Sequence, residues 1–399
     1  MHKKIISLLL LGMLSLSGCS KTQASEDVNE KLVSIEQARE QYLEDINSIT
    51  AKKDGKLIFE DCEFVAFPSF TEVVGLSHSH RGITAQEGWT TIEDWLIQIE
   101  LDDVIDMEVE VRDASGVFNR DDSNESPYCY VCVWDNFSEF ESGHGFLINT
   151  TDCYIQLGED GIYSMSDGTM NRYLKTPGKA FRDALGFTSE NIVKSGMEQD
   201  LHDEQYELID EELTIGAGAE LVEKYFESGT PFEINEKVTV EAVEVNVFCL
   251  GDKYGYEYQV RRVYGGIPFS YLKNSVRTYA SDEYQCDEDW KKAYVADSTG
   301  VCAFTGYSEA EILSPLGDSS NKMLGLKDAV DILNTKLANY LEVNVDRTEL
   351  VYCTIKDKAG ERKSYVTWLF TGINENNGQG IRIYIDVLSG EIYYYTFGE

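Results

Sequence analysis

Two histidines separated by one residue, His78 and His80, have the spacing best suited to metal chemistry. In an extended segment, residues i and i+2 project from the same face, so both imidazoles could bind one zinc ion. His144, between two glycines, would be a third ligand only if the fold brought it near. Histidines exposed in loops fit the same pattern, and no His-Glu-x-x-His motif accompanies them. The spacing predicts a metal site at His78 and His80, with exposed histidines as the alternative.

A second candidate set is aromatic and lies at the end of the chain. Tyr393, Tyr395 and Phe397 alternate with other residues, so a strand would place all three on one face. Exposed rings in such a row form a platform for a sugar or a peptide. A sheet face packed against a neighbouring domain explains the same alternation. We predict ligand binding at these three residues and keep burial as the alternative.

No residues form a recognisable catalytic motif. The chain has no Gly-x-Ser-x-Gly, no phosphate-binding loop and no dinucleotide-binding glycine pattern. Its 71 acidic residues do not single out a pair of carboxylates. The sequence therefore predicts no catalytic residues and no cofactor. An exported hydrolase with its site in residues 56–205 is one alternative to a non-catalytic function, and a glycan- or solute-binding protein is another.

The charge balance restricts the partners. The chain carries 34 basic and 71 acidic residues, a formal net charge of −37, and 42% of its residues are hydrophobic. Such a polyanion is repelled by nucleic acid, which we exclude as a partner. The hydrophobic content is high enough for a packed core, so the chain is expected to be globular. Apart from Cys19, eight cysteines are irregularly spaced and several lie in apolar runs, which favours buried thiols.

The elements that must position these side chains are clearest in the last 75 residues or so. An apolar stripe at helical spacing is followed by four strand candidates separated by turn residues. One helix and four consecutive strands form an antiparallel meander whose apolar face the helix covers. Strands and helices are interspersed without regular βαβ repeats throughout the chain, which indicates an α+β fold. The stripe consists of Leu326, Val330, Leu333, Leu337 and Leu341.

A short internal repeat suggests that this unit occurs twice. The run that begins at Asp386 and the run that begins at Asp297 each place an aspartate at a strand end, then a glycine, then an apolar strand. Each run is preceded by strands and, further back, by an amphipathic helix, near 217–227 and 326–341. We predict tandem helix-plus-meander modules in the C-terminal half and a mixed α+β domain before them.

These hairpins, with the strand–glycine–proline turn at Val263–Phe269, resemble the PepSY-like group of exported bacterial domains. That group is similar to the extracytoplasmic regulators of a cell-wall histidine kinase, which carry tandem modules of this kind. The resemblance covers about 230–399 and implies non-catalytic binding or regulation of an envelope protein or peptide. It supplies no catalytic residues. Those regulators are held by an N-terminal membrane helix. This chain differs from them, because it has a lipobox-like sequence there.

The N-terminus indicates where the protein acts. Lys3 and Lys4 precede an apolar run too short to span a bilayer, as in an export signal. The run ends in Leu16-Ser-Gly-Cys19, which resembles the bacterial lipoprotein lipobox. The resemblance implies cleavage before Cys19 and lipid attachment to its sulfur. We therefore expect a membrane-tethered protein on the outer face of the bacterial cell membrane, or at the outer membrane in a diderm source.

Cleavage before Cys19 would leave 32 basic and 71 acidic residues, a formal charge of −39, so the lipid would provide the membrane attachment that charge opposes. The acidic segment near 198–212 suggests a domain boundary. The predicted organisation is a signal peptide (1–18), a tether with an amphipathic helix near 28–50 (19–55), an N-terminal α+β domain (56–205), a first PepSY-like module (213–315) and a second one (320–399).

Overall fold

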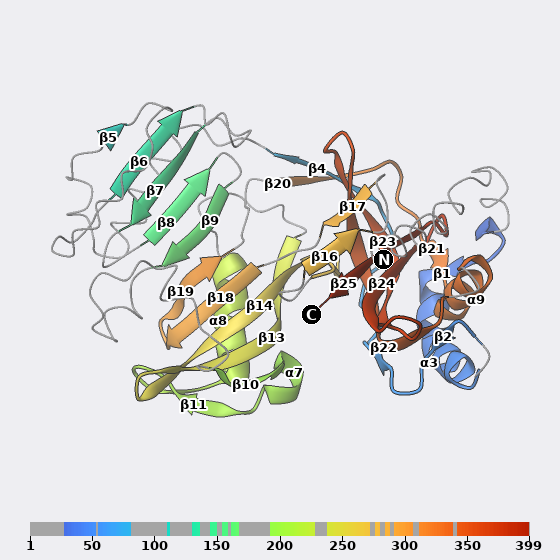
Figure 1. The fold of residues 1–399 in the computed structure, drawn as a ribbon, viewed down its shortest axis with the longest axis horizontal. Helices are drawn as coiled ribbons and strands as arrows, with labels where there is room; N and C mark the ends of the chain where they lie inside the picture. The colour runs from blue at the N-terminus through green and yellow to red at the C-terminus, as the bar shows by residue number, and fades with distance from the viewer. Residues whose placement is uncertain are drawn as a thin grey trace, which may run out of the picture. The chain divides into compact units, whose positions relative to one another are not determined.

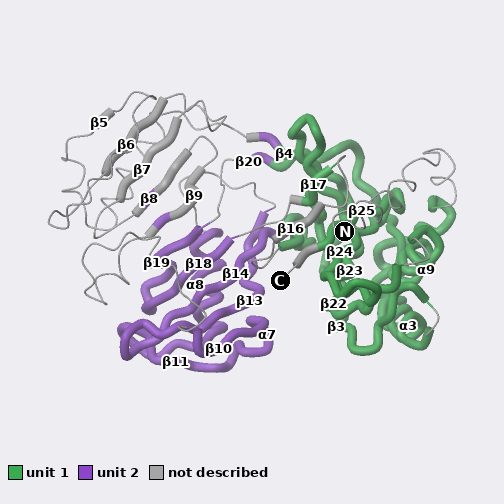
Figure 2. Tube along the Cα trace, in the orientation of Figure 1, with its two compact units in different colours: residues 1–78, 263–289, 313–399 green, residues 79–262, 290–312 purple. Residues whose placement is uncertain are grey.

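The chain divides into two compact units, each built from separated stretches of sequence (Figure 2). Unit 1 contains residues 1–78, 263–289 and 313–399, and unit 2 contains residues 79–262 and 290–312. The structure, a computed structural model, describes residues 28–52, 55–80, 110–111, 130–135, 144–149, 154–158, 161–166, 192–227, 238–271, 276–279, 284–287, 291–305, 311–337 and 341–398.

This division differs from the contiguous domains that the sequence predicts. The range 320–399 lies wholly within unit 1, whereas 213–315 contributes to both units. One reason is an insertion. After Arg262 the chain leaves unit 2, adds two strands to the sheet of unit 1, and returns at Trp290. The predicted signal peptide and lipid attachment site lie outside the described residues.

The described fold is α+β, as expected, and unit 1 contains the predicted helix and meander (Figure 1). The four strands pair consecutively and antiparallel, in the order β22-β23-β24-β25. We name this helix and these strands the second module. Its elements are α9 (Leu326–Lys336), β22 (Val343–Asp357), β23 (Arg362–Asn374), β24 (Gln379–Asp386) and β25 (Ile392–Gly398).

The inserted segment occupies both edges of this meander. Strand β16 (Val276–Tyr279) pairs with β25, and β17 (Tyr284–Asp287) pairs with β22, all antiparallel. Only residues 280–283 separate the two inserted strands in sequence. From β17, the ring of Tyr284 reaches across to Tyr393 of β25, with the ring centroids 5.4 Å apart. The sheet is therefore curled, and the insertion links its two sides.

One face of the β22–β25 sheet packs against two helices, α9 of the same module and α3 (Ile35–Thr50). α3 contacts α9, and its Tyr42 stacks on Trp368 of β23 at 5.7 Å. The Trp368 indole N–H donates to the Leu324 carbonyl, 3.0 Å away, just before α9. The helix predicted near 28–50 begins only at Ile35, because Ser34 and Gln37 form a capping box. Residues Leu32–Ser34 instead form strand β1.

Shorter strands complete the described part of unit 1. β1 pairs antiparallel with β21, and β2 and β3 pair parallel with β22. β15 pairs with the end of β14 (Lys253–Tyr264). β4 pairs with both β20 and β23. Their bounds are β2 (Leu57–Ile58), β3 (Glu63–Phe64), β4 (Leu76–His80), β15 (Ile267–Pro268), β20 (Glu311–Pro315) and β21 (Lys322–Leu324).

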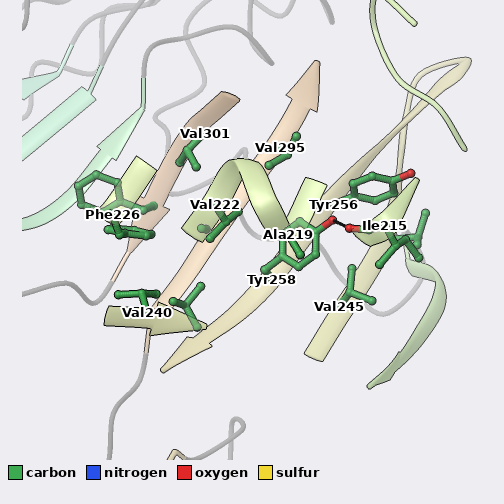
Figure 3. Packing of buried hydrophobic residues seen from close by; sticks show 14 of the residues in the cluster. Ile215, Ala219, Val222, Phe226, Val240, Val245, Tyr256, Tyr258, Val295 and Val301 are labelled. Atoms are coloured by element: carbon green, nitrogen blue, oxygen red, sulfur yellow. Dashed lines mark hydrogen bonds between the residues drawn. The ribbon is translucent and has the colours of Figure 1, made fainter. Parts of the chain in front are cut away.

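Unit 2 contains a second helix followed by a four-stranded antiparallel meander, in the order β13-β14-β18-β19. We name these elements the first module. The helix packs its apolar side on one face of the sheet, where Val222 and Phe226 meet the buried side chains of the strands (Figure 3). The elements are α8 (Ile215–Glu227), β13 (Val238–Leu250), β14 (Lys253–Tyr264), β18 (Lys291–Asp297) and β19 (Gly300–Thr305).

The sheet of the first module continues on both sides. β10 pairs with β13 at one edge, and β9 pairs with β19 at the other. The strands from 110 to 166 thus extend this sheet. The predicted domain 56–205 is therefore divided between the units, because its β2, β3 and most of its β4 belong to unit 1. Remaining elements are β5 (Glu110–Val111), β6 (Tyr130–Asp135), β7 (His144–Asn149), β8 (Tyr154–Gly158), β9 (Gly161–Ser166), β10 (Ile192–Met197), α7 (Glu198–Leu201), β11 (Gln205–Glu207) and β12 (Glu212–Thr214).

The two modules share details beyond their topology. In each last hairpin an aspartate carboxylate accepts backbone N–H groups of the turn: Asp297 from Thr299 at 3.0 Å, and Asp386 from Leu388 and Ser389 at 2.7 Å. In each module, an aromatic side chain of the second of the four strands also donates a hydrogen bond to a backbone carbonyl near the start of the helix. Tyr258 donates to Ile215 at 2.6 Å, as Trp368 does to Leu324. The predicted repeat is therefore present.

The Tyr258 contact predicts the effect of a substitution in α8. A Cβ atom added at Gly218 would overlap the Tyr258 hydroxyl and lie 2.9 Å from Tyr256 Cδ2. Helix propensity alone would make Gly218→Ala stabilising by about 0.5–1 kcal/mol. Because Tyr258 is buried and bonded to the helix itself, we expect destabilisation by about 1–3 kcal/mol instead. Urea unfolding followed by circular dichroism measures the sign.

The control is Gly218→Ala combined with Tyr258→Phe, which removes the overlapping hydroxyl. The double variant should recover part of the loss, because the close approach to Tyr256 remains. A Gly218→Ala variant more stable than the wild type would contradict this packing.

Candidate functional site

His78 is part of a hydrogen-bonded chain inside unit 1. Its Nε2 lies 2.6 Å from the Ser364 hydroxyl, which lies 2.7 Å from the Thr354 hydroxyl. β4 brings His78 to β23, and the pairing of β22 with β23 places Thr354 opposite Ser364. Ser364 is fully buried and Thr354 is buried. A serine beside an imidazole can serve as a nucleophile, but here the hydroxyl has no exposed surface. The chain therefore joins β4 to the meander.

The metal site at His78 and His80 stays a prediction. Among the described residues, no group of three or more His, Cys, Asp or Glu side chains is placed to hold a metal ion. The side chains of His80 and His144 are outside the described part. His78 is half-buried and also meets the ring of Phe269 edge-on at 6.4 Å.

The exposed aromatic platform predicted at the C-terminus needs correction. Tyr393 is 7% exposed and Tyr395 is 1% exposed. Both belong to a core cluster with Leu369 and Tyr384 of the second module. Tyr284 and Cys286 of the inserted β17 pack in the same cluster, so a distant part of the chain covers these rings. The two residues share a face, as the alternation predicts, but that face is interior. The side chain of Phe397 lies outside the described residues.

The face of the first module opposite α8 carries a polar network that no sequence motif predicts. Glu257 is 6% exposed, and three donors reach its carboxylate. Asn246 Nδ2 and Lys292 Nζ lie 2.7 and 2.9 Å from Oε1, and the Tyr294 hydroxyl lies 2.8 Å from Oε2. Ser195 of β10 donates to Asn246 Oδ1 at 2.7 Å, so the network crosses four neighbouring strands.

This network has the properties of a structural link rather than a catalytic group. Burial, and next the Glu257 carboxylate, raise the pKa of Tyr294 far above its ordinary value, so Tyr294 stays protonated and donates. Glu257 has a donor on each oxygen and a paired cation. A carboxylate held in this way is a poor general base or metal ligand.

Gln259 lies beside the network and has a side-chain oxygen that can accept a hydrogen bond. It follows Glu257 on the same face of β14 and is 6% exposed. Its Nε2 donates to the Lys291 carbonyl at 2.8 Å, but its Oε1 has no hydrogen-bond partner among the described residues. A buried acceptor without a donor is costly, so a donor group from water or a ligand would be stabilised there.

The sequence contains a signal for this polar face, although it matches no motif. Glu257, Gln259 and Arg261 alternate with apolar residues, the pattern of a strand with one polar face. The prediction of buried thiols is confirmed for Cys286, Cys302 and Cys353; Cys62 and Cys249 are half-buried, and all five are free. Within the described ranges, no helix is long and apolar enough to cross a membrane.

Comparisons with known proteins do not place the chain in a family. No protein-family model matches it. No curated protein matches it either. Solved structures with some similarity include an uncharacterized protein from Eubacterium rectale ATCC 33656, with a TM-score of 0.49 and 12% identity over 88% of this chain and 98% of that one.

The C-terminal domain of YpeB from Bacillus megaterium is also similar, with a TM-score of 0.24 and 10% identity over 80% of this chain and 100% of that one. At these TM-scores neither likeness assigns a function.

Proposed function

We propose that the protein is a lipoprotein tethered through Cys19 outside the cell membrane, where it binds or regulates an envelope protein or peptide without catalysis. Its two helix-plus-meander modules are proposed to be PepSY-like. The observation that carries this proposal is the way polar side chains are used in the two modules and in the adjoining strand β4. His78 and Ser364 connect strands, and Glu257 is surrounded by donors. Internal hydrogen bonds thus occupy these side chains in the part of the chain that the structure describes.

The lipobox resemblance at Leu16–Cys19 supports the location. Two or three acyl chains, each contributing about 0.8 kcal/mol per buried methylene, anchor a protein stably. The aromatic platform does not support the glycan-binding alternative, because Tyr393 and Tyr395 are buried.

The test is crosslinking in intact cells followed by identification of the captured protein. We expect one membrane or envelope protein to be captured with the wild type and lost with Cys19→Ala, which cannot carry the lipid. The control establishes that Cys19→Ala folds: the circular dichroism spectrum of the purified variant should match that of the wild type. Turnover of a peptide, glycan or ester substrate by the purified protein would overturn the non-catalytic proposal.

A further inference from the structure

Val28, the first described residue, lies beside the last hairpin of the second module. Val28 is buried, and its carbonyl accepts from the Lys31 N–H at 2.9 Å. The Val28 side chain packs on Gly390, where an added Cβ would lie 2.9 Å from Val28 Cγ2. Gly390 has a positive φ of 65° in the turn that joins β24 to β25. Glycine is thus required at this turn both for its backbone conformation and for the close contact.

The position of Val28 is fixed by the residues that follow it. β1 pairs with β21 from Leu32 to Ser34, and the Ile35 N–H donates to the Asn321 carbonyl at 3.0 Å. The Leu324 N–H donates to the Val387 carbonyl at 2.8 Å, which connects β21 to the same hairpin. Val28, the first described residue, therefore lies next to the 386–390 hairpin.

The chain between Cys19 and Val28 is short. Nine residues of polypeptide span about 30 Å at most when fully extended. The opposite end of the meander is the turn between β23 and β24, at residues 374–378. Since β24 has eight residues, that turn lies about 26 Å from the 386–390 hairpin. If the 374–378 turn faced the bilayer, the tether would have to be almost fully extended, at the cost of its conformational entropy.

We propose that the 386–390 hairpin end of the second module faces the lipid head groups and that the 374–378 turn points away from them. This inference rests on lipid attachment at Cys19, as in the proposed function. The hairpin end approaches the bilayer because of tether length, without inserting into it, since the acidic protein is repelled by anionic lipid. The membrane-facing surface is thus determined by where the tether joins the fold.

Energy transfer to vesicles tests this orientation with a matched pair of positions. Glu391 lies next to the hairpin and Glu375 lies in the distal turn, and both are exposed glutamates. A fluorescent non-natural amino acid replaces one or the other in the full-length lipidated protein. The vesicles contain phosphatidylcholine and phosphatidylglycerol, with an acceptor dye on the head groups. We expect at least about twofold greater transfer from position 391, because of its shorter distance to the bilayer.

The outcomes separate the two proposals. Mass spectrometry of the N-terminal peptide first establishes whether Cys19 carries lipid. A lipidated protein with equal transfer from both positions, or greater transfer from 375, overturns the orientation and leaves the lipoprotein proposal intact. An unmodified Cys19 overturns both. Matching circular dichroism spectra show that each labelled variant is folded.

Discussion

Replacing Trp368 with alanine is expected to lower the free energy of unfolding of unit 1 by about 3–5 kcal/mol. Trp368 is 1% exposed and is among the largest fully buried side chains in the described part of the chain. Its ring stacks on Tyr42 of α3, and its N–H donates to the Leu324 carbonyl before α9. One side chain thus connects the meander to both helices. Hydrogen–deuterium exchange of the peptides covering β22–β25 measures the loss.

Trp368→Phe is the matched control, because it keeps an aromatic ring and removes the N–H donor. We expect a smaller loss of about 1–3 kcal/mol, since the Leu324 carbonyl loses its partner while most of the packing remains. Equal losses in the two variants would mean that the hydrogen bond, rather than the packing, provides most of the stability. Exchange in peptides of unit 2 should change little, because the substitution lies in unit 1.

Replacing Lys292 with methionine is expected to destabilise unit 2 by about 3 kcal/mol. Lys292 Nζ lies 2.9 Å from Glu257 Oε1, and the two side chains are 15% and 8% exposed. Methionine retains the length of the side chain but leaves the Glu257 carboxylate buried without its cation. Urea unfolding, with exchange measured in β13, β14 and β18, reports the change.

The double variant Lys292→Met with Glu257→Gln separates charge from packing. Glutamine removes the buried negative charge and keeps one acceptor oxygen, for Asn246 Nδ2. Its amide N–H2 takes the other position, where the Tyr294 hydroxyl can rotate to accept. We expect the double variant to recover at least half of the stability lost in Lys292→Met. A double variant as unstable as the sum of the two single variants would contradict a coupled ion pair.

Local patterns were sufficient to predict much of the fold. The apolar stripe beginning at Leu326 predicts α9, and the aspartate–glycine turns at Asp297 and Asp386 predict the two hairpins. These features depend on residues a few positions apart, so the sequence records them directly. The α+β class and the repeated meander follow from the same patterns.

The parts that could not be predicted depend on contacts between distant residues. The shared face of Tyr393 and Tyr395 follows from alternation, but their burial depends on β17, more than 100 residues earlier. Likewise, Asn246, Glu257 and Lys292 meet only through strand register, which no local motif encodes. One reason why the predicted domain ranges differ from the two units is that an insertion inside one module joins the sheet of the other. Another is that β2 and β3, from the predicted domain 56–205, join the sheet of unit 1.

That insertion also has a consequence for the time course of biosynthesis. β16 is complete about 120 residues before the end of β25, the strand with which it pairs. At about 5–20 residues per second, a ribosome needs about 6–24 s to synthesise that length. During this interval β16 lacks its partner β25, and β17 lacks its partner β22 until residue 357 has been synthesised, so their backbone groups can pair with other chains. A cell making this protein must therefore keep the nascent chain from aggregating until its last residues have been synthesised.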